Sequence, residues 1–128
     1  MIKKFLLFAL IAMVIDFIWI FGNMNSHRKT IYLVQKSEPK IDMVSGTLFY
    51  VLPALGFVLI VDKLSKSWKD ALLYGMLLGL LMYGTFDLTN KTIFTNYPWS
   101  YTVADIAWGT ICIGVSSAIV KFITCSNK

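Results

Sequence analysis

The sequence contains few of the residues on which many enzyme and nucleic-acid sites depend. Its 128 residues include one histidine, His27, one arginine, Arg28, and two cysteines. A single histidine excludes the multi-histidine di-iron sites of membrane desaturases, and phosphate chemistry normally uses more than one arginine. No serine lies in a G-x-S-x-G elbow, and no glycine-rich phosphate loop occurs. These absences remove several enzyme classes.

Charged residues are also scarce, at 15% of the chain, whereas 57% of the chain is hydrophobic. Soluble domains are roughly 45–50% apolar, so the composition places this chain in a lipid bilayer. The net charge of +5 does not indicate nucleic-acid binding, because no basic run is interleaved with aromatic residues. Contact with anionic lipid headgroups explains the charge more simply. We interpret Cys112 and Cys125 as free thiols, because a bridge between them would not fit one helix.

Four apolar segments predict an all-α integral membrane bundle of four antiparallel transmembrane helices. We place the spans at about residues 4–22, 46–62, 70–87 and 102–122, in a single domain covering residues 1–128. Each apolar run is close to the roughly 20 residues that cross a 30 Å hydrocarbon core. The first run has the basic start of a signal peptide, but no small-x-small cleavage site follows it. We therefore interpret it as an uncleaved helix.

The distribution of basic residues orients the bundle by a small margin. The N-terminus, the second loop and the tail hold seven Lys and Arg residues, and the first and third loops hold five. Three lysines in the short second loop favour the cytoplasm for both termini. The long first loop, residues 23–45, contains His27 and has two interpretations: a solvated connector whose basic side chains touch lipid headgroups, or a gate or lid.

Small residues recur at helical spacing on the third and fourth spans. Gly75 and Gly79 are four residues apart on the third span, and Gly109 lies on the fourth. Membrane helices approach one another closely through such faces, so we predict that these glycines pack helix against helix. Pro53 predicts a kink in the second span, because proline leaves a helical carbonyl unpaired.

Three acids lie in or beside the apolar runs: Asp16, Asp87 and Asp105. All three fall in the outer half of the bundle if the N-terminus is inside, and they stay grouped if the topology is inverted. A carboxylate at such a depth normally faces the bundle interior and marks function. We predict a polar site formed by Asp16, Asp87, Asn90 and Asp105, with Trp19, Tyr83 and Trp108 in its wall.

Two short motifs surround these acids, and each has two interpretations. The spacing D-x-x-W occurs at Asp16–Trp19 and at Asp105–Trp108, which puts acid and indole one turn apart on one helix face. It is either a coincidence or an inverted repeat of the kind found in some transporters. The segment DLTN, residues 87–90, either ends the third helix and fixes the loop, or contributes polar groups to the site.

The same residues resemble a known family. Phe86-Asp-Leu-Thr-Asn90, Pro98 and Asp105-Ile-Ala-Trp-Gly109 resemble the signature of the uncharacterised "predicted membrane protein" family, domain of unknown function 2177, and Asp16-x-x-Trp19 is similar too. The family usually has a tyrosine where this chain has Phe86, and Trp-Pro where this chain has Tyr97-Pro98-Trp99. The resemblance implies a four-span membrane protein with a polar site at these positions, and it implies no reaction.

Three functions fit these observations. We rank first a multi-pass membrane protein without enzymatic activity, which binds or moves a small polar or lipidic ligand or assists another membrane protein. A lipid-modifying enzyme that uses the carboxylates as acid, base or metal ligands is second. A proton- or cation-coupled transporter, which would need to oligomerise at four spans, is third.

The chemistry of the acids leaves their role open. Carboxylates that approach one another in a low dielectric cannot all ionise, which suits a proton relay. Oxygen ligands suit Mg²⁺ or Ca²⁺ better than zinc or iron, but the sequence assigns no metal, no catalytic residue and no cofactor. The expected partners are membrane lipids, with a second copy of the chain or another membrane protein as further candidates, and no nucleic acid.

Overall fold

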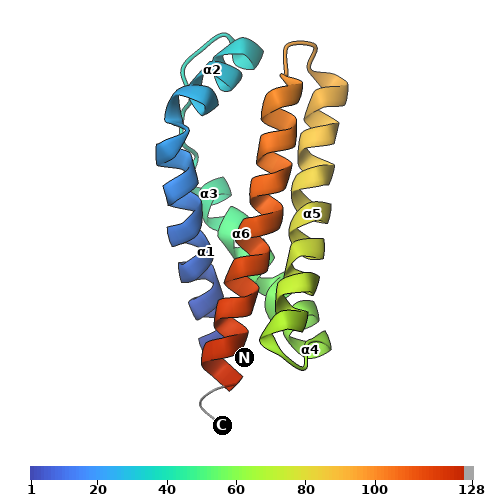
Figure 1. The fold of residues 1–128 in the computed structure, drawn as a ribbon. Coiled ribbons are helices and arrows are strands. Elements are labelled where there is room, and N and C mark those ends of the chain that lie inside the picture. The colour runs from blue at the N-terminus through green and yellow to red at the C-terminus, as the bar shows by residue number, and fades with distance from the viewer. Residues whose placement is uncertain (126–128) are drawn as a thin grey trace.

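The computed structural model describes residues 1–125, which are almost entirely helical and contain no β-strand (Figure 1). The elements in chain order are α1 (Ile2–Gly22), α2 (Met24–Gln35), α3 (Met43–Gly56), the π-helix η1 (Phe57–Val61), α4 (Asp62–Leu64), α5 (Trp68–Ile93) and α6 (Trp99–Cys125). Because α3, η1 and α4 are continuous, the described chain has four helical segments long and apolar enough to cross a membrane: 2–22, 43–64, 68–93 and 99–125. The prediction of an all-α protein with four membrane helices is confirmed.

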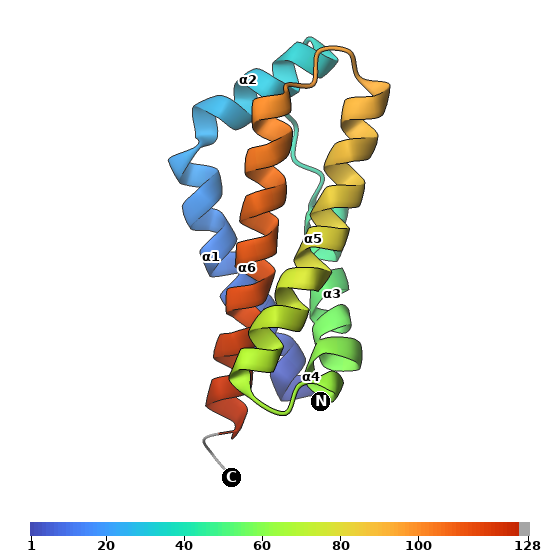
Figure 2. The ribbon, with the colours of Figure 1, turned by 45° about the vertical axis from the view of Figure 1, so that its right-hand side comes forward.

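The helices run alternately up and down (Figures 1 and 2). The start of α1 and the end of α6 lie at one end of the bundle, which we call the terminal end. At the opposite end α2 lies across the tops of the long helices, beside the loop that joins α5 to α6. We call this the α2 end. Which end faces the cytoplasm stays a prediction from the basic residues.

Local capping explains where several helices begin. The Asp42 side chain accepts a hydrogen bond from the Ser45 backbone N–H (2.7 Å) at the start of α3. Ser67 and Asp70 form a reciprocal capping box at the start of α5, which satisfies two backbone donors that a helix start leaves without a partner. α1 and α2 meet at a single residue, Asn23, so the predicted first loop is largely a helix.

The interpretation of DLTN as a helix-ending motif is wrong. α5 continues through residues 87–90 to Ile93, and the Phe94 backbone N–H still donates to the Asn90 carbonyl (2.8 Å). No glycine or proline follows Asp87 until Pro98, so nothing in this stretch breaks the helical hydrogen-bond pattern. Thr89 and Asn90 are therefore presented from helix faces rather than from a loop.

The second membrane segment changes its helical geometry next to proline. Pro53 lies inside α3, and the π-helical turn η1 begins at Phe57, one turn later. Proline removes one backbone donor, and a π-turn is a frequent response where the regular ladder of hydrogen bonds is disturbed. The side chains of η1 are central to the core, because Phe57 and Val61 are almost fully buried and Phe57 stacks on Phe8 of α1 (4.8 Å).

α5 and α6 form the most extensive helix pair. A side chain at Gly79 would meet the backbone of Gly109 and Thr110, and one at Gly75 would meet Ser117. Gly109 in turn packs against the ring of Tyr83. Such close approach of backbones needs small residues, since dispersion contacts hold membrane helices together. The packing surface predicted from the glycine spacing is the α5–α6 contact.

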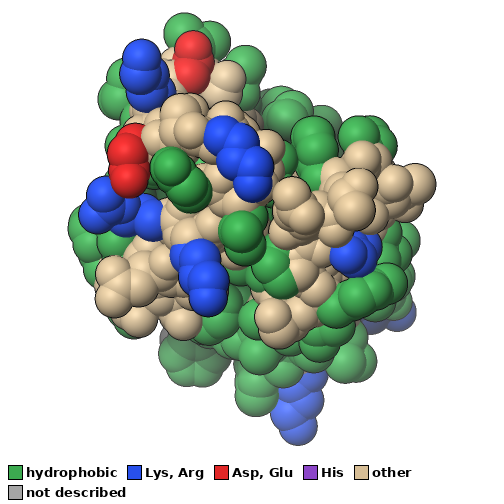
Figure 3. Space-filling view, turned by 90° about the horizontal axis from the view of Figure 1, so that it is seen from above, with side chains coloured by type: hydrophobic (Ala, Val, Ile, Leu, Met, Phe, Trp, Pro, Cys, Tyr) green, Lys and Arg blue, Asp and Glu red, His purple; other side chains and the backbone are tan. Residues whose placement is uncertain are grey.

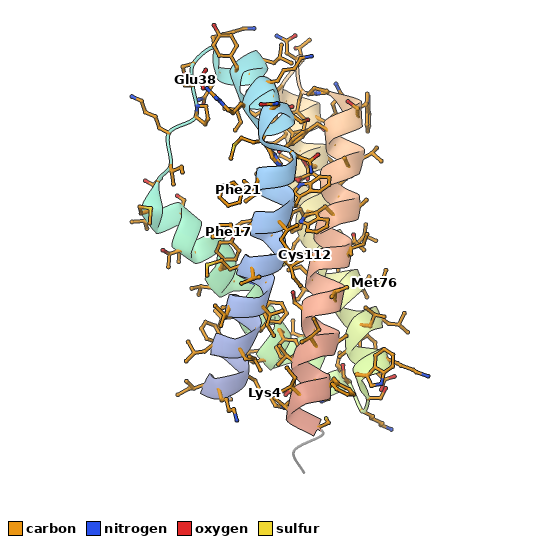
Figure 4. All side chains as sticks on the ribbon, turned by 60° about the vertical axis from the view of Figure 1, so that its left-hand side comes forward. Lys4, Phe17, Phe21, Glu38, Met76 and Cys112 are labelled. Carbon is orange, nitrogen blue, oxygen red and sulfur yellow. The ribbon has the colours of Figure 1, made fainter. Side chains whose placement is uncertain are left out.

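An ion-pair cluster lies at the terminal end, and the sequence interpretation missed it. Asp62 accepts hydrogen bonds from Lys4 of α1 (2.7 Å) and Lys121 of α6 (2.9 Å). Lys121 also donates to the Asp62 carbonyl (2.8 Å) and is only 7% exposed. Figure 4 labels Lys4 at this end and Glu38 at the other. The cluster joins α1, α4 and α6 by charge.

Candidate functional site

The three acids of the predicted site lie at the same level of the bundle. Asp16 is six residues before Gly22, where α1 ends, and Asp87 is six residues before Ile93, where α5 ends. Asp105 is six residues after Trp99, where α6 begins. Six helical residues span about 9 Å, so each acid lies about two turns from the helix end nearest α2. We call these three residues the carboxyl cluster.

Asp16 is 5% exposed and receives one hydrogen bond on each carboxylate oxygen. The Tyr50 hydroxyl of α3 donates to Oδ2 (2.9 Å), and the Trp108 indole N–H of α6 donates to Oδ1 (3.2 Å). Asp16 therefore links three helices. Tyr50 was not among the predicted site residues; the signal available in the sequence was its place on the same helix face as Pro53.

The two D-x-x-W motifs interact crosswise. Trp19 of α1 and Trp108 of α6 stack face to face, with ring centroids 4.9 Å apart and planes 7° from parallel. Trp108 donates to the acid of the other motif, Asp16. Trp19 lies beside Asp105, but its buried indole N–H falls outside hydrogen-bond geometry. Each indole thus faces the acid of the opposite helix, and the predicted wall residues Trp19 and Trp108 form one aromatic slab.

Asp87 is fully buried and is held by a residue from the loop after α5. The Tyr97 hydroxyl donates to Asp87 Oδ1 (2.6 Å), and Asn90 lies beside that hydroxyl. Burial raises the pKa of Tyr97, and the hydrogen bond to Asp87 acts in the same direction. Tyr97 therefore stays a neutral donor. Phe86, where the family usually has tyrosine, is 59% exposed and faces away from the cluster.

The other oxygen of Asp87 lacks a donor. Oδ2 is buried and has no hydrogen-bond partner among residues 1–125, although Asp105 is its direct ionisable neighbour. Two ionised carboxylates offer acceptors only, so they cannot hydrogen-bond to each other. A proton or another donor has to lie between them, because a buried unpaired carboxylate oxygen is costly.

α2 covers the cluster from above. His27 Nδ1 lies 2.7 Å from the Tyr101 hydroxyl of α6, and the imidazole packs edge-on against Trp19. Burial lowers the pKa of His27, against the opposing effect of the Asp16 charge, so the neutral imidazole is favoured. Its second nitrogen, Nε2, is buried without a hydrogen-bond partner in the described chain. Viewed from this end, basic side chains are spread over the surface (Figure 3).

A small pocket adjoins the cluster on the side of α3. Its lining includes Asp16, Phe49, Tyr50, Tyr83 and Cys112, from all four membrane segments. The free space holds about one water molecule. Tyr83, predicted as a wall residue, is 9% exposed and lies one turn before Asp87. The pocket is the place where the cluster reaches free space inside the bundle.

The arrangement brings most of the predicted site residues together. Asp16, Asp105, Trp19 and Trp108 interact directly, Asp87 adjoins Asp105, and Asn90 joins through Tyr97. Sequence reasoning missed Tyr50, Tyr97, Tyr101 and the inward position of His27. Among residues 1–125, no three His, Cys, Asp or Glu side chains are arranged to hold a metal ion.

The comparisons with known proteins give one match. A family model described as "Predicted membrane protein (DUF2177)" matches residues 1–122, which is nearly the whole chain. No curated protein and no solved structure matches the chain.

Proposed function

Because the chain belongs to the DUF2177 family of predicted membrane proteins, whose description names no activity, we propose its function from the site: the carboxyl cluster binds a small polar or lipidic ligand inside the membrane. The protein is an integral membrane protein, and the ligand enters the half of the bundle next to α2. The protein acts by holding or presenting this ligand, and its partners are membrane lipids and membrane proteins.

One observation carries this proposal. Three buried polar atoms in and beside the cluster have no hydrogen-bond partner among residues 1–125: Asp87 Oδ2, Trp19 Nε1 and, on the ring that packs against Trp19, His27 Nε2. Packing alone does not explain such atoms, because each unpaired buried group costs roughly 1–3 kcal/mol. A ligand that both donates and accepts hydrogen bonds would satisfy them.

The apolar core below the site argues for binding rather than conduction. Phe8, Phe57, Val61 and Val120 are at most 1% exposed and lie toward the terminal end. A carrier would have to open this layer, whereas a binding protein would not. A lipid-modifying enzyme remains the alternative, since a carboxyl pair with one proton suits general acid and base chemistry.

Native mass spectrometry of the protein purified in a mild detergent tests the proposal. We expect the wild type to retain a bound molecule that Asp105→Asn loses. Asp42→Asn is the matched control, because Asp42 is an exposed acid outside the cluster and asparagine also caps helices. Equal retention by wild type and Asp105→Asn would contradict the proposal. A changed lipid profile in cells that lack the protein would favour the enzyme alternative.

A further inference from the structure

The charges of the carboxyl cluster have no basic partner, in contrast to the acid at the terminal end. Asp62 binds two lysine ammonium groups, and Glu38 pairs with Arg28. In the described part of the chain, Asp16, Asp87 and Asp105 form no ion pair, and burial favours a neutral His27. Buried carboxylates are normally paired or protonated. The cluster therefore has the charge of a site for a cation.

The unpaired oxygen of Asp87, Oδ2, indicates that the ligand carries a hydrogen-bond donor. Asp87 is fully buried, its Oδ2 has no hydrogen-bond partner among residues 1–125, and Asp105 is its ionisable neighbour. An ammonium group has three N–H donors. It would satisfy Asp87 Oδ2 and Asp105 together while it neutralises their charge, whereas the Trp19 N–H, which only donates, would need an acceptor elsewhere on the ligand.

Several aromatic side chains lie near these acids. Trp19, Tyr97 and Tyr101 lie on the α2 side, and Phe49, Tyr50 and Tyr83 line the pocket at Asp16. The faces of aromatic rings attract ammonium groups, and the attraction strengthens when the site is desolvated. Metal ions fit less well, because Asp16 already accepts from Tyr50 and Trp108 and the acids do not converge on one point.

We propose that the carboxyl cluster binds a primary ammonium group, supplied either by a small soluble amine or by the amino headgroup of a lipid. The proposal deepens the proposed function and rests on it. The group is primary because it must offer N–H donors to both Asp87 and Asp105, and a tetraalkylammonium group has none. Asp87 and Asp105 accept its N–H bonds, and Asp16 adds negative charge.

Tryptophan fluorescence tests this proposal, because Trp19 and Trp108 stack within the site. The background variant Trp68→Phe, Trp99→Phe removes the two exposed tryptophans at the helix ends. At fixed pH and ionic strength in detergent, we expect a saturable fluorescence change with ethylammonium chloride if the ligand is a soluble amine. If it is a lipid headgroup, we expect the fluorescence to differ between phosphatidylcholine and phosphatidylethanolamine vesicles. Tetramethylammonium should give no saturable change. Asp105→Asn should weaken the response at least tenfold, and Asp42→Asn should leave it unchanged.

The two parts of the experiment distinguish a soluble amine from a lipid headgroup, and they distinguish failure of the ammonium proposal from failure of the proposed function. A response to ethylammonium assigns a soluble amine, and a response to phosphatidylethanolamine alone assigns a lipid headgroup. Equal responses to tetramethylammonium, or no response in either arm, would overturn the ammonium proposal. If Asp105→Asn fails to fold, Asp87→Asn replaces it, because it also removes one carboxylate of the cluster, and an unchanged response in a folded cluster variant overturns the proposal. A bound molecule lost from Asp105→Asn in mass spectrometry would still support the proposed function.

Discussion

Replacing Asp62 with alanine should lower the free energy of unfolding by about 2–3 kcal/mol, between the values for exposed and for fully buried ion pairs, because the cluster is partly buried. The Lys121 side chain is 9% exposed, and in the variant its ammonium group would lose the carboxylate that lies 2.9 Å away. The ammonium group of Lys4, which binds the same carboxylate, would then repel it. The measurement is unfolding in mixed micelles of mild detergent and dodecyl sulfate.

The matched control for this prediction is Glu38→Ala. Glu38 pairs with Arg28 at a similar distance, 2.8 Å, but both side chains are more than half exposed. Exposed ion pairs contribute about 0–1 kcal/mol, so this variant should unfold almost like the wild type. Adding Lys121→Met to Asp62→Ala should recover part of the loss, since it removes the unpaired charge. Equal effects of Asp62→Ala and Glu38→Ala would contradict the structure of the cluster.

Replacing Gly79 with alanine should separate α5 from α6 and lower the free energy of unfolding by about 2 kcal/mol, within the range for overpacking. The added carbon would meet the backbone of Gly109 and Thr110, which cannot move without moving the whole helix. Gly84→Ala is the control on the same helix, because a carbon there meets nothing within 4 Å. The ratio of folded to unfolded protein in mixed micelles would measure both variants. Because alanine favours a helix more than glycine does, equal harm from Gly84→Ala and Gly79→Ala would contradict the close contact of α5 and α6 at Gly79.

Some features of the fold follow from the sequence because they depend on composition and spacing. Apolar runs long enough to cross a bilayer predict the four long helices, and the glycine spacing predicts the α5–α6 contact. The common level of the three acids also follows, since each lies near the end of an apolar run. These predictions need only the length and direction of each helix.

Other features depend on how each helix rotates about its axis, which a helix apolar on all sides does not reveal. The crosswise contacts of Trp19 and Trp108 and the reach of Tyr97 to Asp87 required the assembled bundle. From the sequence, Lys4 and Lys121 indicated only which side of the membrane the termini face. Their pairing with Asp62 was not predictable, because Asp62 is 58 or 59 positions away from each of them in the chain. The polar residues of DLTN suggested that the helix ends there. Helix α5 continues to Ile93 because no glycine or proline lies between Asp87 and Pro98.

Residues that serve a ligand often reduce the stability of the protein without it. Asp87 Oδ2 illustrates this cost, because it faces Asp105 without a donor. An amide at this position would place an N–H₂ group where the unpaired oxygen lies and would keep the acceptor for Tyr97. A cluster that only fixes the bundle would gain nothing from such a change.

The thermal stability of Asp87→Asn, measured after ligand is stripped by extensive detergent washing, therefore tests the central claim most directly. We expect the variant to be more stable than the wild type by about 1 kcal/mol, the value of a typical hydrogen bond, because the amide donates to Asp105. A stripped variant that unfolds at a clearly lower temperature than the stripped wild type would contradict it and assign the carboxyl cluster a structural role.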